Sequence, residues 1–207
     1  MLETALDLLG SGGSDAVTVR AVCREARLNP RYFYESFDDV DALLTALYDD
    51  VAEALATAVA TALAELGGDP AAGATGSPPT TGLAGGGRLG VDLAEVVRVG
   101  VDTVFRFVAD DPRRARILYT EALGHEALAR RRLASTDDFI AAITEPVAGT
   151  DVALDVVTAS MFTGGMNEIL VGWLGGRIDR SLDDLVDEAV ALALVVLGAG
   201  TSTPRQR

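Results

Sequence analysis

Lysine is absent from this 207-residue chain, so all seventeen basic residues are arginines. The thirty-one Asp and Glu residues outnumber them, and the formal net charge is −14. A chain this acidic is a poor general binder of phosphate backbones. Any contact with nucleic acid must therefore come from a local surface rather than from the charge of the whole protein.

Cysteine and histidine are nearly absent too. The single cysteine, Cys23, excludes an internal disulfide, and its place on the apolar face of a predicted helix indicates a buried side chain. The single histidine, His125, is expected to pack or turn, because a metal site needs more ligands. The glycine-rich stretch 85–90 lacks the preceding strand and following Lys-Ser/Thr of a phosphate loop, and no catalytic triad is readable. We therefore expect no enzyme, no cofactor and no metal.

Long apolar runs are missing as well. The longest uncharged apolar run, residues 189–200, is too short to cross a bilayer, and no signal peptide opens the chain. These features predict a cytoplasmic protein that has no membrane partner. The first predicted helix begins at Leu2 without a capping or polar lead-in, so we expect an arm to precede it.

Alanine, leucine and valine are abundant, while the alternation typical of strands is scarce. The predicted fold class is therefore all-α. Apolar spacing predicts helices over residues 2–9, 19–26, 30–36, 40–66, 92–109, 112–123, 126–144, 152–175 and 182–197. Residues 67–89 are mostly Gly, Pro, Thr and Ala, and we expect a flexible loop there because they offer no core.

The most distinctive stretch is RLNPRYFYESF, residues 27–37, which places four aromatic rings in a chain that has few. Thr18 can cap the second helix, Asn29 can cap the third, and Pro30 suits the first position of a helix. Three short helices with a tight break between the second and third predict a helix-turn-helix whose third helix enters a DNA major groove. The residues expected to contact DNA are Thr18, Arg20, Asn29, Arg31, Tyr32 and Tyr34.

Within this motif the side chains are expected to divide their roles. Arg31 and Tyr32 lie near the start of the third helix, where base edges are reached, and Tyr34 can donate its hydroxyl to a phosphate or pack on a thymine methyl. Phe33 and Phe37 are expected inside, where they would pin a helix too short to hold itself. The alternative is that all four rings fill the core of a small bundle.

Residues 15–49, DAVTVRAVCREARLNPRYFYESFDDVDALLTALYD, resemble the tetracycline-repressor (TetR) family of bacterial transcription regulators. The resemblance rests on Thr18, Ala26, Leu28, Asn29, Tyr34, Phe37, Leu43 and Leu44. It implies a DNA-binding domain at residues 1–48 and a helical ligand-binding and dimerisation domain at residues 49–207. It also implies a homodimer on a DNA operator, a repressor that a small-molecule effector releases. Arg27 replaces the usual Gly of the family, so the turn must accept a side chain there.

The last two predicted helices are more apolar than one amphipathic stripe requires, which predicts contact with a second copy of the chain, Val190 and Leu194 included. The stretch 160–173 favours either dimer core or a mostly apolar effector pocket. The residues expected to line that pocket are Phe105, Tyr119, Phe162, Met166 and Asn167.

Six arginines lie in two short stretches, 110–116 and 128–135. They are expected to pair with carboxylates, or alternatively to contact an anionic effector or the DNA-binding unit. Two competing functions stay open. One is a small helical enzyme or carrier; the other is a TetR-like protein with weak or lost DNA binding, because residues 1–60 hold four arginines against eleven acidic residues.

Overall fold

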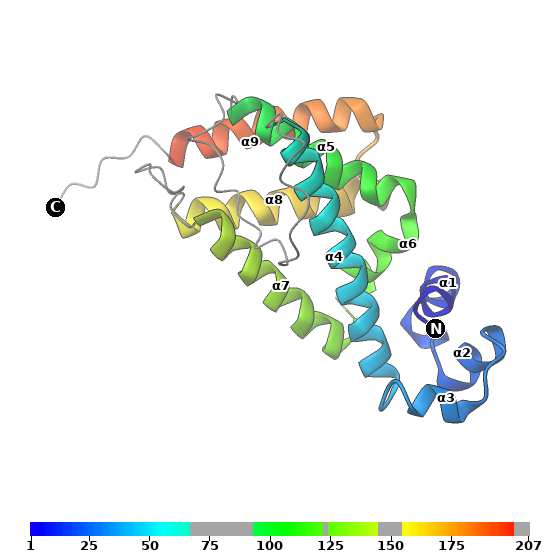
Figure 1. Cartoon of the computed structure of the whole chain (residues 1–207). Coiled ribbons are helices and arrows are strands. Elements are labelled where there is room, and N and C mark those ends of the chain that lie inside the picture. Colours follow the sequence, from blue (N-terminus) through cyan, green and yellow to red (C-terminus); the bar gives the residue numbers. More distant parts are fainter. Residues whose placement is uncertain (67–92, 122–123, 145–154, 201–207) are drawn as a thin grey trace. The chain divides into compact units, whose positions relative to one another are not determined.

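The computed structural model describes residues 1–66, 93–121, 124–144 and 155–200, and no strand occurs within these ranges (Figure 1). The helices are α1 (Leu2–Gly12), α2 (Val19–Glu25), α3 (Pro30–Tyr34), α4 (Val40–Leu66), α5 (Leu93–Asp110), α6 (Pro112–Ala115), α7 (Glu126–Thr144), α8 (Val156–Leu174) and α9 (Leu182–Gly200). A 3₁₀ turn, η1 (Ser14–Ala16), follows α1. The all-helical prediction is confirmed, whereas the loop predicted at 67–89 lies outside the described residues.

Several predicted helix boundaries differ from the structure, and two of these differences have a clear physical cause. Gly10 and Gly12 lie inside α1, which ends at Gly12, and the capping residue Gly13 has a φ of 74°, in the left-handed region that glycine adopts without cost. The helix predicted over 112–123 is instead the short α6 followed by a π-helical turn, η2 (Arg116–Thr120). Arg116 pairs with Glu121 at 2.8 Å, and their spacing of five residues is the π-helical repeat, which places both side chains on the same side.

The described chain divides into two compact units. One combines Met1–Leu55 with Val108–Ser135, and the other combines Ala56–Phe107 with Thr136–Arg207. This division follows packing rather than function, so the predicted functional boundary between residues 48 and 49 stays a prediction.

The first unit has a core built by the small N-terminal helices. Its α1 contacts α2, α6 and η2, and α2 contacts α3. The buried side chains include Ala5, Leu6, Leu9, Val22, Cys23, Phe33, Leu43, Leu44 and Leu47. Burial of each large apolar side chain contributes roughly 1.5–3 kcal/mol, which such short helices need because they are marginal alone. The prediction that Cys23 is a buried apolar side chain is confirmed.

The second unit is built around α8 and α9, which pack against each other. Arg98 of α5 pairs with Asp187 of α9 at 2.6 Å, and Arg106 of α5 pairs with Asp183 at 2.7 Å, so α5 also lies beside α9. The predicted surplus of apolar surface is present, because Val156, Val157, Met161, Leu192 and Val195 are all exposed. Val190 was a wrong choice for that surface: it is 4% exposed and belongs to the chain's own core.

Candidate nucleic-acid interface

The start of α2 is fixed by Thr18. Its backbone is extended (φ −123°, ψ 151°), and its Oγ1 accepts a hydrogen bond from the Ala21 N–H at 3.1 Å. This is the geometry of a side-chain N-cap, which satisfies one of the unpaired donors in the first helical turn. The predicted cap at Thr18 is confirmed, and Arg20 follows it as an exposed side chain of the first turn.

The turn that follows α2 is tighter than an ordinary loop. The Leu28 N–H donates to the Cys23 carbonyl at 2.9 Å, and the Arg27 N–H donates to the Arg24 carbonyl at 3.3 Å. Together these bonds form a Schellman motif, whose penultimate residue must be left-handed. Arg27 holds that position with φ 56°, so the turn does accept a side chain where glycine would be unstrained.

The start of α3 repeats the logic of α2. The Asn29 Oδ1 accepts a hydrogen bond from the Arg31 N–H at 3.0 Å, and Pro30 occupies the first helical position. Proline costs nothing there because its missing N–H would have no helical partner. The five-residue α3 therefore begins where the sequence predicts, and its first turn presents Arg31 and Tyr32.

The aromatic rings of α3 separate into buried and exposed sets. Phe33 is fully buried, while Tyr32 and Tyr34 are 55% and 60% exposed. The Phe33 ring lies 5.4 Å from the Tyr34 ring in a T-shaped arrangement and 5.9 Å from the Phe37 ring. Phe37 is only half-buried, so Phe33 is the residue that anchors the helix. The exposure of both tyrosines argues against a helix whose rings all fill a core.

The arginines on and near α3 differ in whether they form an ion pair with a described residue. Arg31 Nε donates to the Glu35 carboxylate at 2.9 Å across one helical turn, and Arg24 pairs with Glu25 at 2.9 Å. Both pairs are exposed, and surface pairs of this kind contribute little, about 0–1 kcal/mol. Arg20 and Arg27 form no ion pair with any residue that the structure describes, so their full charge is available to a phosphate.

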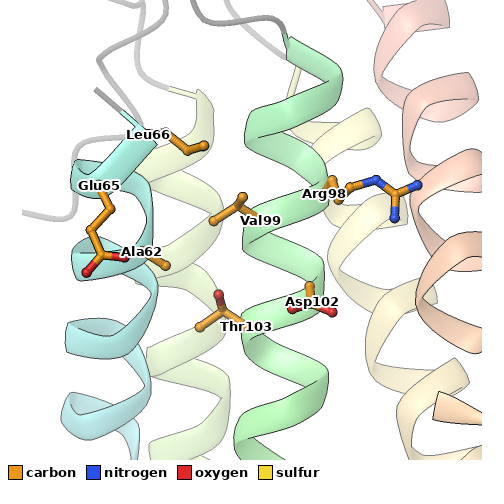
Figure 2. A pocket seen from close by; sticks show the side chains of 7 residues that line it. All are labelled: Ala62, Glu65, Leu66, Arg98, Val99, Asp102 and Thr103. Atoms are coloured by element: carbon orange, nitrogen blue, oxygen red, sulfur yellow. The ribbon is translucent and has the colours of Figure 1, made fainter. Parts of the chain in front are cut away.

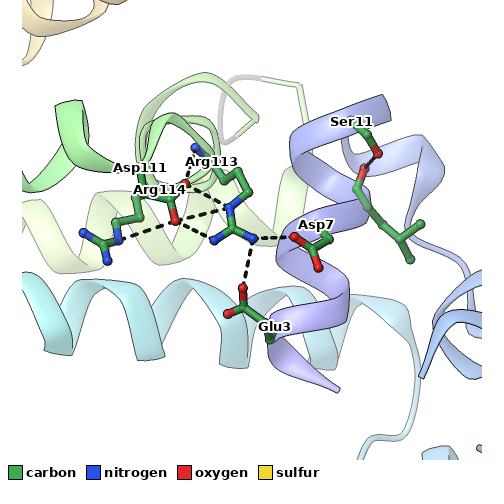
Figure 3. A network of polar contacts seen from close by, with 7 residues as sticks. Glu3, Asp7, Ser11, Asp111, Arg113 and Arg114 are labelled. Atoms are coloured by element: carbon green, nitrogen blue, oxygen red, sulfur yellow. Dashed lines mark hydrogen bonds and ion pairs between the residues drawn. The ribbon is translucent and has the colours of Figure 1, made fainter. Parts of the chain in front are cut away.

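A polar network ties α1 to the residues around α6 (Figure 3). Arg113 Nη1 donates to Glu3 at 2.9 Å and also pairs with Asp7, while Arg113 Nη2 donates to Asp111 at 2.7 Å. The Asp111 carboxylate, Glu3 and Asp7 raise the pKa of the Arg113 guanidinium, and Arg113 in turn lowers the pKa of Asp111. Arg113 thus does both things expected of its stretch: it pairs with carboxylates, and two of them belong to α1, the first helix of the predicted DNA-binding unit.

A second link joins η2 to the end of α1. Arg116 Nη1 donates to the Gly10 carbonyl at 2.8 Å, and the Ser14 N–H donates to the Glu121 carboxylate at 2.9 Å. Burial alone would raise the pKa of Glu121, but the hydrogen bonds from Ser14 and Arg116 outweigh burial and lower it. The sequence offered no signal for these pairs, because the partners lie more than a hundred residues apart.

The predicted effector residues do not form one described pocket. Phe105 is buried in α5, whereas Phe162, Met166 and Asn167 are half-buried on α8. Tyr119 is buried in η2 and belongs to the other compact unit. Their role in binding a ligand stays a prediction.

Two hollows can be described, and neither contains the residues Phe105, Tyr119, Phe162, Met166 or Asn167 that were expected to line an effector pocket. The first has a volume of about 500 Å³, is open to solvent, and lies between the end of α4 and α5 (Figure 2). Its lining residues are Ala62, Glu65, Leu66, Arg98, Val99, Asp102 and Thr103. The second is lined by the end of α8 and the turn after it, where the Trp173 indole N–H donates to the Arg180 carbonyl at 3.0 Å. Both hollows are shallow openings rather than enclosed cavities.

The buried Tyr119 belongs to a cluster of polar side chains together with Tyr48 and Arg132. Burial raises the pKa of the Tyr119 hydroxyl to about 12, and the neighbouring Tyr48 adds to this effect. The Tyr48 pKa is also raised by burial, which a hydrogen bond with Ser135 and the charge of Arg132 oppose. Arg132 itself has no carboxylate partner within the described ranges, although its neighbour Arg131 pairs with Asp49. The group therefore combines two tyrosine hydroxyls with a guanidinium that no described carboxylate pairs with.

His125 lies close to the start of α7. Its Nε2 is 3.4 Å from the Asp41 carboxylate, and its buried Nδ1 has no hydrogen-bond partner among the residues that the structure describes. Among the described residues, no three His, Cys, Asp or Glu side chains gather as metal ligands would. None of the helices within those residues has both the length and the hydropathy of a bilayer span.

Comparison with known proteins agrees with the motif. Residues 1–47 match the family model for bacterial regulatory proteins of the tetR family. Among curated proteins, no sequence matches this chain.

Solved structures match the chain over nearly its whole length. A TetR-family regulator from Syntrophomonas wolfei str. Goettingen has a TM-score of 0.71 at 12% identity, covering 98% of this chain and 95% of its own. The fatty acid degradation regulator FadR from Bacillus halodurans has a TM-score of 0.67 at 16% identity, covering 95% and 96%. FadR from Bacillus subtilis, solved with stearoyl-CoA, has a TM-score of 0.62 at 15% identity, covering 97% and 96%.

Identities this low show a shared fold and nothing finer. The motif match and the fold nevertheless agree with each other, because the family model covers the helices whose caps, turn and buried ring are described above. Residues 1–47 are therefore similar to bacterial regulatory proteins of the tetR family, and the chain has the fold of TetR-family transcription regulators.

Proposed function

We propose that this protein is a ligand-responsive transcriptional repressor that binds a DNA operator as a homodimer in the cytoplasm. One observation carries the DNA-binding part. A capped α2, a closed turn and a capped α3 surround the buried Phe33, which leaves Arg31, Tyr32 and Tyr34 exposed. In this arrangement α3 is a recognition helix, and residues 1–48 are the DNA-binding domain.

Each exposed residue has a role that its chemistry suits. Arg31 and Tyr32 contact base edges from the first turn of α3, whereas Tyr34 donates its hydroxyl to a phosphate. Thr18, Arg20 and Asn29 stand at the starts of α2 and α3, where backbone N–H groups and a guanidinium can hold the DNA backbone. Different residues therefore contact the base edges and hold the DNA backbone.

The dimer and the effector belong to residues 49–207. The exposed Met161, Val157 and Val195 of α8 and α9 are the surface that a second copy would cover. Phe105, Phe162 and Met166 supply apolar contacts for an effector, and Asn167 supplies a polar anchor. Effector binding would change the spacing of the two recognition helices and so weaken the fit to a two-fold operator.

The group around Tyr119 favours an effector that carries an anionic group. Arg132, which pairs with no carboxylate of the described residues, lies with the hydroxyls of Tyr48 and Tyr119, and an anion could pair with its charge. Bacillus subtilis FadR, whose structure contains stearoyl-CoA, has a similar fold, which supports an effector with both an apolar and an anionic part.

A second candidate function is favoured by the exposed pair between Arg31 and Glu35. The carboxylate engages a base-reading guanidinium and also repels phosphate. A protein of this fold could therefore bind DNA weakly and act through ligand or protein contacts. The conservative change Glu35→Gln removes the competing charge and should tighten operator binding by a few-fold, since a surface pair is worth about 0–1 kcal/mol. An unchanged dissociation constant would mean that this carboxylate does not restrain binding.

The test of the proposed function is a mobility-shift titration with the full-length protein and the DNA upstream of its own gene, over a series of salt concentrations. Binding should weaken linearly in log–log form as salt rises, because phosphate contacts release counterions. It should also be tighter than binding to scrambled DNA of equal length. Equal affinity for both DNAs, or no shift at low salt, would contradict the proposal.

A further inference from the structure

Arg27 has a backbone conformation that its side chain makes costly. Among the described residues it is the one non-glycine residue with positive φ, at 56°. In the left-handed region the Cβ atom approaches the following carbonyl oxygen, and glycine avoids that contact. The Schellman hydrogen bonds around Leu28 require this conformation, so the turn would form with less strain if residue 27 were glycine.

Nothing within the described chain compensates for this strain. The Arg27 side chain is exposed and makes no hydrogen bond or ion pair there, although the sequence holds thirty-one acidic residues. The arginines on either side differ, because Arg24 pairs with Glu25 and Arg31 pairs with Glu35. A strained residue with an unpaired charge is typical of a functional position, where the compensating contact comes from a ligand.

The position of Arg27 suits an anionic ligand on the DNA side. Asn29, the cap of α3, lies two positions further along the chain, so the two Cα atoms lie within about 7 Å of each other. The start of a recognition helix lies at the edge of the major groove, which phosphates border. A guanidinium presents several donors in a planar fork that matches phosphate oxygens.

We propose that Arg27 is a further DNA-binding residue, a phosphate contact made by the turn between α2 and α3. This inference rests on the proposed DNA-binding function and adds a residue to it. The contact carries no base specificity, because every phosphate offers the same oxygens. The strain at φ 56° and the unpaired guanidinium are then parts of one arrangement, in which the DNA supplies the missing partner.

The experiment compares four full-length variants with the unmodified protein. Arg27→Gly removes both the charge and the strain, Arg27→Gln removes the charge alone, and Arg27→Lys keeps the charge. Arg24→Gln is the matched control, because it removes an arginine three residues away that already pairs with Glu25. Each protein is titrated against a short mixed-sequence duplex and against the upstream DNA over a salt series, and its melting temperature is measured.

Arg27→Gly and Arg27→Gln should both weaken binding to the two DNAs by a similar factor, roughly tenfold for one charge-assisted contact. Both should reduce the slope of log K against log salt by about one. Arg27→Lys should keep most of the slope of log K against log salt. Arg24→Gln should change neither the affinity nor this slope by much. Arg27→Gly should melt at the same temperature as the unmodified protein or higher, which a purely structural role would not allow.

Several results would overturn the proposal. If Arg27→Gln binds like the unmodified protein while Arg27→Gly is weakened, the effect comes from backbone freedom and not from the guanidinium. If the slope is unchanged in both variants, Arg27 contacts no phosphate. A lower melting temperature for Arg27→Gly would remove the strain argument. If the unmodified protein binds neither DNA, the proposed function itself fails, which the unmodified titration reveals by itself.

Discussion

Two regions of this molecule expose large side chains, and they differ in chemistry. On α3 the exposed side chains are Tyr32 and Tyr34, whose hydroxyls are polar, and the charged Arg31 lies beside them. On α8 and α9 the exposed side chains include Val157, Met161 and Val195, which have no polar atom that can donate a hydrogen bond. A binding partner could cover either region, but the two regions suit different partners.

This difference in chemistry indicates which kind of partner would cover each region. Tyrosine and arginine present apolar bodies with donors at the tip, which suits phosphates and base edges. Valine and methionine offer only apolar area, which is stabilised by another apolar surface such as a second copy of the chain. Changes at the two regions should therefore separate DNA binding from dimerisation.

The largest effect is expected at α8 and α9. Replacing both Met161 and Val195 with Glu should abolish the dimer, because two unpaired charges in an apolar interface cost several kcal/mol and raise the dissociation constant more than roughly a thousandfold. Light scattering at matched concentrations measures the mass. Leu133→Glu is the control, since Leu133 is as exposed as Met161, at 66%, but lies on α7. A double variant that remains dimeric would place the interface elsewhere.

Within α3 the buried ring should matter far more for stability than its exposed neighbours. Phe33→Ala should lower the free energy of unfolding by about 3–5 kcal/mol, because it empties a fully buried site. Tyr32→Ala, on the exposed face of the same short helix, should change it by only about 0.5 kcal/mol. Urea titrations of the two variants test this contrast. Similar losses would mean that the tyrosine rings also belong to the core.

The exposed residues of α3 should matter more for DNA binding than for stability. Arg31→Ala should weaken operator binding by about 1–3 kcal/mol and relax the preference at one base pair, because base contacts carry specificity. Tyr34→Phe should weaken operator and scrambled DNA alike, because a phosphate contact is independent of sequence. Neither change should move the melting temperature much. Arg31→Ala with full affinity and selectivity would show that α3 does not read bases.

The last effect depends on pH and concerns the hydrogen bond between Ser14 of η1 and the Glu121 carboxylate. Hydrogen bonds lower the pKa of Glu121, so its stabilising contribution is complete above its ordinary value of 4.5 and is lost as the pH falls through the lower folded value. Glu121→Gln should therefore be less stable than the unmodified protein at neutral pH, by about 1–3 kcal/mol. The difference should shrink below pH 4.5. Urea midpoints at both pH values measure it, with the exposed Glu126→Gln as the control; a difference that persists in acid would contradict this account.

Much of the candidate interface could be predicted because its signals are local. The caps at Thr18 and Asn29 and the proline at the first position of α3 depend on residues within a few positions of each other. The bounds of α4 were predicted correctly for the same reason, since apolar spacing along one helix is visible in the chain. The burial of Phe33 also follows from its place between two polar-tipped tyrosines.

Other features depend on contacts that no local pattern encodes. The bonds from Arg113 to Glu3 and Asp7 join residues more than a hundred positions apart, and the π-helical turn depends on a pair at an unusual spacing. The burial of Val190 was also missed, because both faces of α9 are apolar and the sequence cannot say which one its own core takes.

Local patterns were sufficient to predict the helix-turn-helix, its caps and the all-helical class, because backbone hydrogen bonds and side-chain spacing act over one or two helical turns. Three features depend instead on tertiary structure: the strain at Arg27 and its lack of a partner among the described residues, the ion pairs between Arg113 and α1, and the exposed faces of α8 and α9. Those properties depend on which distant side chains come within a few ångströms. Packing and charge pairing settle that question, and neither is visible in the order of residues alone.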